Sequence, residues 1–150
     1  MPERPGFEIP PRTTPADDNG YFEQMTKAVF QAGFSWQVVS DKWPNFEQAF
    51  DGFDVDRVAA YGPEDVDRLL SDQGIVRNGR KIEATIANAI QFQTIRREFG
   101  SFAKYLRSLD NLTYRKRQKI LAKRFKNLGR TSVFVFLWCV NEEVPDWEDR

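Results

Sequence analysis

Helix start and stop signals recur at short intervals from residue 17 onward, and they constrain the fold of this chain more than any other feature. Most apolar patterns with a helical period run for only a few turns before a cap, a glycine or a proline interrupts them. Pro44 and Pro63 each suit the first turn of a helix, and Gly33 suits a helix end. The predicted N-cap residues are Ser35, Asp54 and Ser101. The sequence therefore predicts an all-α, compact multi-helix domain of roughly seven to nine mostly short helices.

The longest predicted helix runs from about Arg80 to Arg97, and residues 114–126 form a second, basic amphipathic helix. Their apolar faces are expected to hold Ile82, Ile86, Ala89, Ile90 and Phe92 in the first helix and Ile120, Leu121 and Phe125 in the second. Residues 131–140 are apolar enough for a buried strand, but no partner strand is visible elsewhere. A buried helix capped by Thr131 is therefore the favoured interpretation.

The proline distribution separates an N-terminal arm from the rest of the chain. Residues 1–16 hold five of the eight prolines and no periodic apolar pattern, so we expect an extended or poorly ordered arm. Residues 17–150 are expected to form a single domain. Because the chain start lacks a secretion signal and no apolar run is long enough to span a bilayer, we expect a cytoplasmic protein without membrane association.

The chain has no histidine and one cysteine, Cys139. A disulfide within the chain is therefore impossible, and a zinc site of the usual cysteine and histidine kind is excluded. The commonest general base and every histidine-activated nucleophile are absent as well. Any catalysis must use carboxylates, lysine, tyrosine or water, and we expect no metal and no cofactor.

The net charge is zero, but the charges are distributed unevenly. Residues 1–72 carry 14 acidic and 6 basic side chains, whereas residues 73–130 carry 3 acidic and 15 basic ones. The last twenty residues are acidic again, with 5 acidic side chains and 1 basic. A strongly basic middle in a neutral protein indicates a surface that faces a polyanion. The alternative is a solvated basic face that interacts with the acidic segments.

Residues 69–82 have the layout of a helix-hairpin-helix element, in which a helix ends at a glycine, an apolar plug follows and a second helix opens on basic residues. Gly74 is expected to take a positive φ and Ile75 to anchor the turn in the core. The first amides of the second helix would then face a DNA phosphate. The predicted backbone-binding residues are Gly74, Ile75, Val76, Arg77, Asn78, Arg80 and Lys81. The alternative is an ordinary helical corner.

A second basic face is predicted on the helix over residues 114–126. It includes Arg115, Lys116, Lys119 and Lys123. This face is expected either to contact the DNA backbone beside a site or only to keep the protein soluble.

Three blocks, in unbroken order, resemble the DNA-3-methyladenine glycosylase I family. They are Tyr21-Phe22-Glu23-Gln24-Met25 with Gln31-Ala32-Gly33-Phe34-Ser35-Trp36; Gly74-Ile75-Val76-Arg77-Asn78 with Lys81-Ile82-Glu83-Ala84 and Ala87-Asn88-Ala89; and Phe125-Lys126, Leu128-Gly129-Arg130-Thr131 and Cys139-Val140-Asn141. The resemblance implies an all-helical glycosylase fold that bends DNA and flips a damaged nucleotide out of the stack. It also implies a base pocket formed by Trp36, which falls on the family's stacking tryptophan, and by Gln31 and Ala28.

The chain departs from the family pattern at the positions that carry chemistry. The family's active-site glutamate falls on Ala28, and its C-terminal zinc histidine and cysteine fall on Glu143 and Trp147. Its N-terminal zinc cysteine and base-contacting tyrosine have no counterpart. The resemblance therefore implies weak or absent excision of 3-methyladenine, with Trp147 packing as a substitute tie between the chain ends.

Three other side chains are candidates for the chemistry of the missing carboxylate. Glu23 lies five residues before Ala28 and faces elsewhere on a helix. Asp41 is the candidate replacement carboxylate to test first, although a capping or ion-pair role is the favoured interpretation. Lys27 would serve as an amine nucleophile only if burial lowered its pKa.

Three hypotheses for the function follow. The first is a base-excision repair glycosylase with weak or altered hydrolysis, acting as a monomer on damaged double-stranded DNA and, in a prokaryote, associated with the nucleoid. The second is a catalytically inactive relative that binds damaged DNA as a sensor or repair partner. The third is a helical protein-interaction module.

Overall fold

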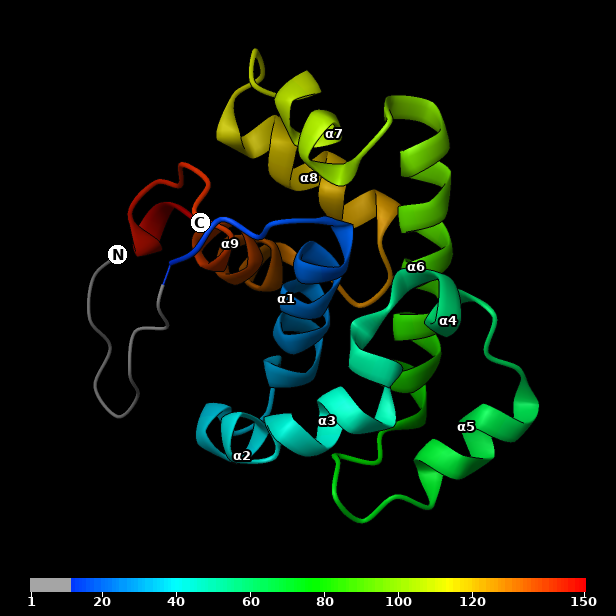
Figure 1. Ribbon diagram of the computed structural model, residues 1–150. Helices are drawn as coiled ribbons and strands as arrows, with labels where there is room; N and C mark the ends of the chain where they lie inside the picture. The colour runs from blue at the N-terminus through cyan, green and yellow to red at the C-terminus, as the bar shows by residue number, and fades with distance from the viewer. Residues whose placement is uncertain (1–11) are drawn as a thin grey trace.

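The computed structural model describes residues 12–150, and every regular element in this part of the chain is helical (Figure 1). The α-helices are α1 (Asp18–Gln31), α2 (Trp36–Asp41), α3 (Trp43–Ala49), α4 (Val55–Ala59), α5 (Pro63–Leu70), α6 (Gly79–Phe99), α7 (Phe102–Ser108), α8 (Tyr114–Arg124) and α9 (Arg130–Cys139). Two short 3₁₀ helices are η1 (Asp51–Phe53) and η2 (Trp147–Asp149). The predicted all-α fold is confirmed.

The predicted N-caps lie where the sequence indicated. The hydroxyl of Ser35 accepts the Val38 amide at 3.3 Å and begins α2, and Asp54 accepts the Arg57 amide at 3.1 Å and begins α4. Ser101 caps α7 in the same way. α1 ends just before Gly33, whose φ of 68° is readily adopted only by glycine. Local cap chemistry therefore sets most of the helix boundaries.

The apolar segment near the C-terminus is a buried helix, as the sequence analysis favoured, but it does not begin at Thr131. α9 starts at Arg130 after Gly129, whose extended backbone provides the cap position without a side-chain hydrogen bond. Thr131 lies inside the helix, and its hydroxyl accepts a hydrogen bond from the Arg150 side chain at 3.1 Å. The Thr131 hydroxyl therefore binds a side chain 19 residues further along the chain and does not cap its own helix.

Two residues assigned to apolar faces are exposed. Ile90 is 46% exposed because it stands two residues before the fully buried Phe92, about 200° around α6. Ile120 is 37% exposed because it is about 100° from the buried Leu121 on α8. The expectation that these two isoleucines pack inward was wrong.

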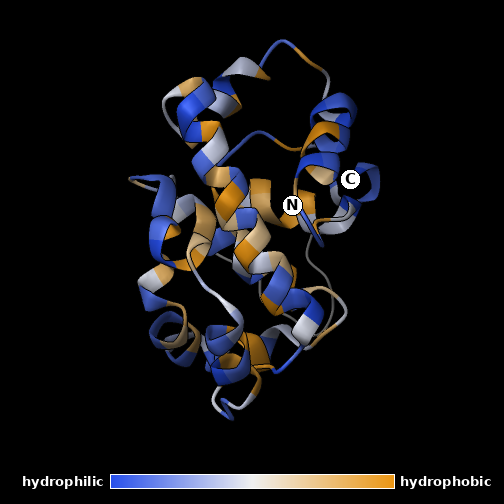
Figure 2. Cartoon of the chain, turned by 90° about the vertical axis from the view of Figure 1, so that its right-hand side faces the viewer, coloured by the Kyte–Doolittle hydropathy of each residue, from blue (hydrophilic) through white to orange (hydrophobic). Residues whose placement is uncertain are grey.

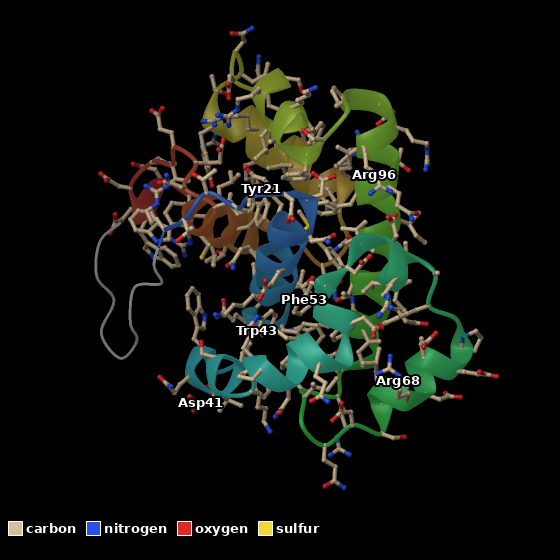
Figure 3. The ribbon with its side chains drawn as sticks, viewed as in Figure 1. Tyr21, Asp41, Trp43, Phe53, Arg68 and Arg96 are labelled. Carbon is tan, nitrogen blue, oxygen red and sulfur yellow. The ribbon has the colours of Figure 1, made fainter. Side chains whose placement is uncertain are left out.

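α1 lies centrally and contacts α6 and α9 (Figure 1). Hydrophobic segments concentrate in the middle of the molecule and hydrophilic segments occupy its periphery (Figure 2). Beside α1, Trp43 stacks on Phe53 with ring centroids 5.1 Å apart and planes 7° apart (Figure 3). Phe46 and Phe50 extend this stack, so α3 and η1 form a rigid aromatic layer under the end of α1.

One buried side chain fixes the connection between α8 and α9. Asn88 of α6 is 1% exposed; its amide nitrogen donates to the Lys126 carbonyl at 3.1 Å, and its oxygen accepts the Lys126 amide at 2.7 Å. This paired contact holds the backbone that leads to Gly129 and the start of α9.

The segment at residues 12–14 is tied to the far end of the chain. The Thr13 amide donates to the Cys139 carbonyl at 3.1 Å, and the Arg12 guanidinium lies 4.0 Å from the centroid of the Trp138 ring. The Asn141 amide donates to the Thr14 hydroxyl at 3.2 Å. Most of the predicted arm, residues 1–11, lies outside the described residues, and the division of the chain at residue 17 stays a prediction.

Candidate functional site

A cavity of about 410 Å³ opens beside the C-terminal end of α1, and it is called here the Trp36 cavity. Its walls come from α1 and the turn after it, from the first residue of α2, from the start of α9 and from the segment around η2. The side chains most relevant to its chemistry are Ala28, Gln31, Trp36, Thr131, Trp147 and Arg150. The three residues predicted for the base pocket, Ala28, Gln31 and Trp36, therefore meet in one cavity.

The position of each of these three side chains follows from local structure. Ala28 and Gln31 are three residues apart on α1, so they share a face, and both are at least 95% buried. Trp36 is the first residue of α2 and is half-buried. The positive-φ turn at Gly33 and the Ser35 cap bring α2 back across the end of α1 and direct its first residue to the cavity.

The opposite wall was not predicted as part of the pocket. Trp147 is 9% exposed and packs edge-on against Phe134 of α9, with ring centroids 5.4 Å apart. Arg150 lies over the Trp147 ring at 4.0 Å, donates from Nε to Thr131 and donates from Nη1 to the Trp147 carbonyl at 2.8 Å. Trp147 thus packs against α9 and also lines the cavity, and its predicted role as a tie between the chain ends stays a prediction.

Among residues 12–150, none that lines the Trp36 cavity carries a carboxylate. Glu23 accepts a hydrogen bond from the Trp43 indole at 2.9 Å, so it faces away, as predicted. Asp41 is exposed at the end of α2, where it accepts a hydrogen bond from Gln37 at 2.8 Å (Figure 3). The structure does not bring the candidate replacement carboxylate to the pocket.

A smaller cavity of about 110 Å³ adjoins the first and shares Ala28, Gln31 and Val135 with it. Lys27 and Cys139 also line this cavity. Burial raises the pKa of the Cys139 thiol to about 11, so the thiol is protonated at neutral pH. The Lys27 ammonium lies 5.5 Å from the centroid of the Trp43 ring. Lys27 and Cys139 line the smaller cavity and not the Trp36 cavity, so neither is arranged as a nucleophile toward the Trp36 cavity.

The turn between α5 and α6 has the predicted anchor but not the predicted glycine geometry. Ile75 is 3% exposed and belongs to the core. Gly74 does not take a positive φ; its amide donates to Asp72 at 2.8 Å and its carbonyl accepts the Asn45 side chain at 3.0 Å. A Cβ at this position would come within 3.2 Å of Asn45. The reason that a small residue suits this position is therefore the close approach of neighbouring side chains, and not a positive φ at Gly74.

The cations of the turn have different roles. Lys81 donates to the carbonyls of Phe30 at 3.1 Å and Ala32 at 2.6 Å, so it caps the end of α1, and burial lowers its pKa. Arg77 and Arg80 are exposed. The side chain of Asn78 accepts the Lys81 amide at 3.1 Å and caps α6. Of the three predicted cationic contacts, Lys81 is thus already bound within the protein.

The turn opens directly onto the Trp36 cavity through a second hollow. This hollow, of about 510 Å³, is lined by Asn78, Arg80 and Lys81 on one side and by Arg130 on the other. It shares Ala32, Thr131 and Ser132 with the Trp36 cavity. The structure therefore places the predicted backbone-binding turn beside the predicted base pocket.

The second basic face is remote from this arrangement. Arg115, Lys116, Lys119 and Lys123 are exposed on α8, and α8 lies at the opposite end of the molecule from α5 and its turn (Figure 1). The two predicted basic surfaces are therefore not brought together.

Residues 12–150 include no group of three or more cysteine, aspartate or glutamate side chains arranged to hold a metal ion. No helix among them is sufficiently long and apolar to cross a bilayer.

A family model described as methyladenine glycosylase matches residues 12–132. DNA-3-methyladenine glycosylase 1 of Escherichia coli (strain K12) is 37% identical over 95 residues, which are 63% of this chain and 51% of that protein. DNA-3-methyladenine glycosylase of Haemophilus influenzae (strain ATCC 51907 / DSM 11121 / KW20 / Rd) is 28% identical over 95 residues, 63% of this chain and 51% of its own length. The matched region thus spans about half the length of these curated relatives.

Solved structures cover more of the chain. The crystal structure of a 3-methyladenine DNA glycosylase I is 33% identical, with a TM-score of 0.75 and coverage of 85% of this chain and 81% of that one. The Staphylococcus aureus 3-methyladenine DNA glycosylase I, solved to explain its recognition of 3-methyladenine, is 27% identical, with a TM-score of 0.76 and coverage of 85% and 78%.

Proposed function

Because the chain belongs to the methyladenine glycosylase family, we propose that it is a DNA-3-methyladenine glycosylase-like protein of base-excision repair. It binds damaged duplex DNA and receives a flipped, alkylated base against Trp36. Its hydrolysis of the N-glycosidic bond is weak or altered compared with that of its relatives.

The observation that carries this proposal is the Trp36 cavity itself. Three side chains selected from sequence, Ala28, Gln31 and Trp36, line one cavity of about 410 Å³. An indole at the wall of a concave site offers a flat surface for a base that has left the helical stack. The buried Gln31 adds an amide that both donates and accepts hydrogen bonds at the edge of a base.

The position of the turn between α5 and α6 supports binding to duplex DNA. Its exposed Arg80 lines a hollow that continues into the Trp36 cavity, and Arg77 is exposed in the same turn. Phosphate contacts there would position the duplex without reading its sequence. Binding should therefore weaken steeply with rising salt, and a double Arg77→Gln, Arg80→Gln variant should reduce both the affinity and its salt dependence.

The chemistry of the cavity supports weak hydrolysis. None of the described residues that line the cavity carries a carboxylate, and Ala28 stands at the position where the family resemblance places the active-site glutamate. Without a carboxylate, water must attack unassisted, and the positive charge that develops on the sugar lacks a stabilising partner.

The test is release of 3-methyladenine from methylated duplex DNA by the full chain and by Ala28→Glu. We expect the glutamate to raise the release rate by at least tenfold, toward the roughly 10²–10⁴-fold that a general base contributes. Ala28→Gln is the matched control, since it has nearly the same size but no charge, and should give no gain. A parent chain as fast as the Escherichia coli relative would contradict weak hydrolysis.

A catalytically inactive damage-binding protein is the second candidate, and the carboxylate-free lining favours it specifically. Tighter binding to methylated than to unmethylated duplex, with no base release over a panel of methylated and deaminated bases, would select this candidate. Measurable release of any base in the panel would select the enzyme.

A further inference from the structure

We propose that the Trp36 cavity selects an uncharged base that presents a carbonyl oxygen, and that Arg150 is the residue responsible for this selection. This inference rests on the proposed function, because it concerns the base that enters the same cavity. It narrows the substrate class from alkylated bases in general to those that remain neutral.

The first observation is that Arg150 is held in place at the cavity wall. Its guanidinium stacks on Trp147 at 4.0 Å, and two of its N–H groups are bound by the Thr131 hydroxyl and the Trp147 carbonyl. Trp147 is itself fixed edge-on against Phe134. A guanidinium carries five N–H donors, so these two bonds leave further donors for an acceptor in the cavity.

The second observation is that no carboxylate among residues 12–150 forms an ion pair with this cation. No carboxylate of the described residues lies within ion-pair distance of Arg150, and none lines the cavity. Arg117, Arg130 and Arg150 all act on the Tyr114 hydroxyl in the sense that lowers its pKa. Burial outweighs them and raises that pKa to about 12.

The consequence follows from elementary electrostatics. A cationic alkylated base that enters the cavity meets a like charge in a partly buried site, where screening by water is reduced. A neutral base meets no such repulsion, and a carbonyl oxygen at its edge can accept a charge-assisted hydrogen bond from the guanidinium. The arrangement of Trp147 and Arg150 therefore changes which bases the cavity accepts.

The test compares two duplexes that differ in charge alone. One contains 7-methylguanine, which is cationic, and the other contains 7-methyl-7-deazaguanine, its neutral isostere with the same carbonyl group. Affinities of the full chain for both and for an undamaged duplex are measured by fluorescence anisotropy at fixed salt. We expect the neutral lesion to bind about tenfold more tightly than the cationic one, which corresponds to about 1.4 kcal/mol.

Two variants assign the effect to one side chain. Arg150→Gln removes the charge at the cavity and should bring the ratio of the two affinities close to one. Arg115→Gln removes the same charge from the exposed face of α8 and should leave the ratio unchanged. Because both variants lose one positive charge, a general weakening of DNA binding cannot imitate this difference.

The outcomes separate the two proposals. If both lesions bind more tightly than undamaged duplex but equally well, or if the cationic lesion is preferred, the inference about charge is overturned while the base pocket stands. If neither lesion binds more tightly than undamaged duplex, the proposed function fails, and this inference fails with it. An unchanged ratio in Arg150→Gln overturns the role of Arg150.

Discussion

Replacing Asn88 by alanine should destabilise the domain severely, because this side chain makes two hydrogen bonds to the backbone between α8 and α9. Asn88 is buried on α6 and makes two hydrogen bonds to Lys126, one to each backbone polar group of that residue. Alanine keeps the helix but removes the side-chain nitrogen and oxygen that bind the Lys126 carbonyl and amide. The Lys126 amide and carbonyl then remain partly buried without a bond.

The size of the effect can be worked out from these contacts. Each hydrogen bond contributes about 1 kcal/mol net, and leaving its buried partner unsatisfied raises the cost to about 1–3 kcal/mol. Two such groups give a loss of about 3 kcal/mol in the free energy of unfolding for Asn88→Ala. For a domain of this length, a loss of that size lowers Tm by about 6–12 °C.

Urea unfolding followed by circular dichroism measures this loss directly. Asn111→Ala is the matched control, because Asn111 is exposed in the turn before α8, and this variant should change the free energy of unfolding by less than about 0.5 kcal/mol. An Asn88→Ala variant that loses less than about 1 kcal/mol, with an unchanged dependence on urea, would refute the reasoning. It would mean that water satisfies the Lys126 backbone equally well.

Three further predictions concern titratable side chains. Since burial raises the pKa of Cys139 to about 11, only about one thiol in a thousand is ionised at pH 8, so alkylation by iodoacetamide should be far slower in the native protein than in urea. Lys81→Met removes the two hydrogen bonds to the end of α1 and should cost about 1–2 kcal/mol in urea unfolding; an unchanged midpoint would argue against the cap. Hydrogen bonds from Arg96 and Gln93 hold the pKa of Asp56 below its usual value in the folded protein. The ionised carboxylate therefore contributes to the free energy of unfolding at pH values above the pKa of the unfolded chain, and this contribution is lost as the pH falls through the pKa of the folded protein. Because the pair is well exposed, Asp56→Asn should cost less than about 1 kcal/mol at pH 7, and the difference from the parent should vanish in strong acid.

The sequence predicted best those features that depend on neighbours a few residues away. Ser35, Asp54 and Ser101 cap their helices through amides three residues ahead, so the residue type and its position suffice. Thr131 matched the same pattern, but its hydroxyl binds Arg150 instead. A local signal fails when a distant partner competes for the same atom.

The glycine of the turn shows the same limit. Gly74 was expected to supply a positive φ, which is a property of the local backbone. What crowds a larger residue there is the approach of Asp72 and of Asn45, and Asn45 stands 29 residues earlier and binds the Gly74 carbonyl. Sequence alone does not reveal such a tertiary contact.

In the candidate site, too, neighbouring residues were predicted from the sequence, whereas residues from a distant segment were not. Ala28, Gln31 and Trp36 lie within nine consecutive residues, and the family resemblance identified them together. Trp147 and Arg150 line the same cavity but come from a segment with no helical periodicity, so the sequence predicted packing for Trp147 alone and nothing for Arg150. The absence of histidine remains the strongest exclusion that the sequence provides, because it depends on composition and not on geometry.

The walls of the Trp36 cavity come from opposite ends of the chain, and this has a consequence for synthesis on the ribosome. The turn between α5 and α6 is synthesised before α6, whereas the cavity wall that holds Trp147 and Arg150 is synthesised after α9. During translation the chain therefore acquires the turn that is proposed to face a phosphate well before both walls of the cavity are present. A product shortened by its last four residues would keep that turn and lose the wall formed by Trp147 and Arg150.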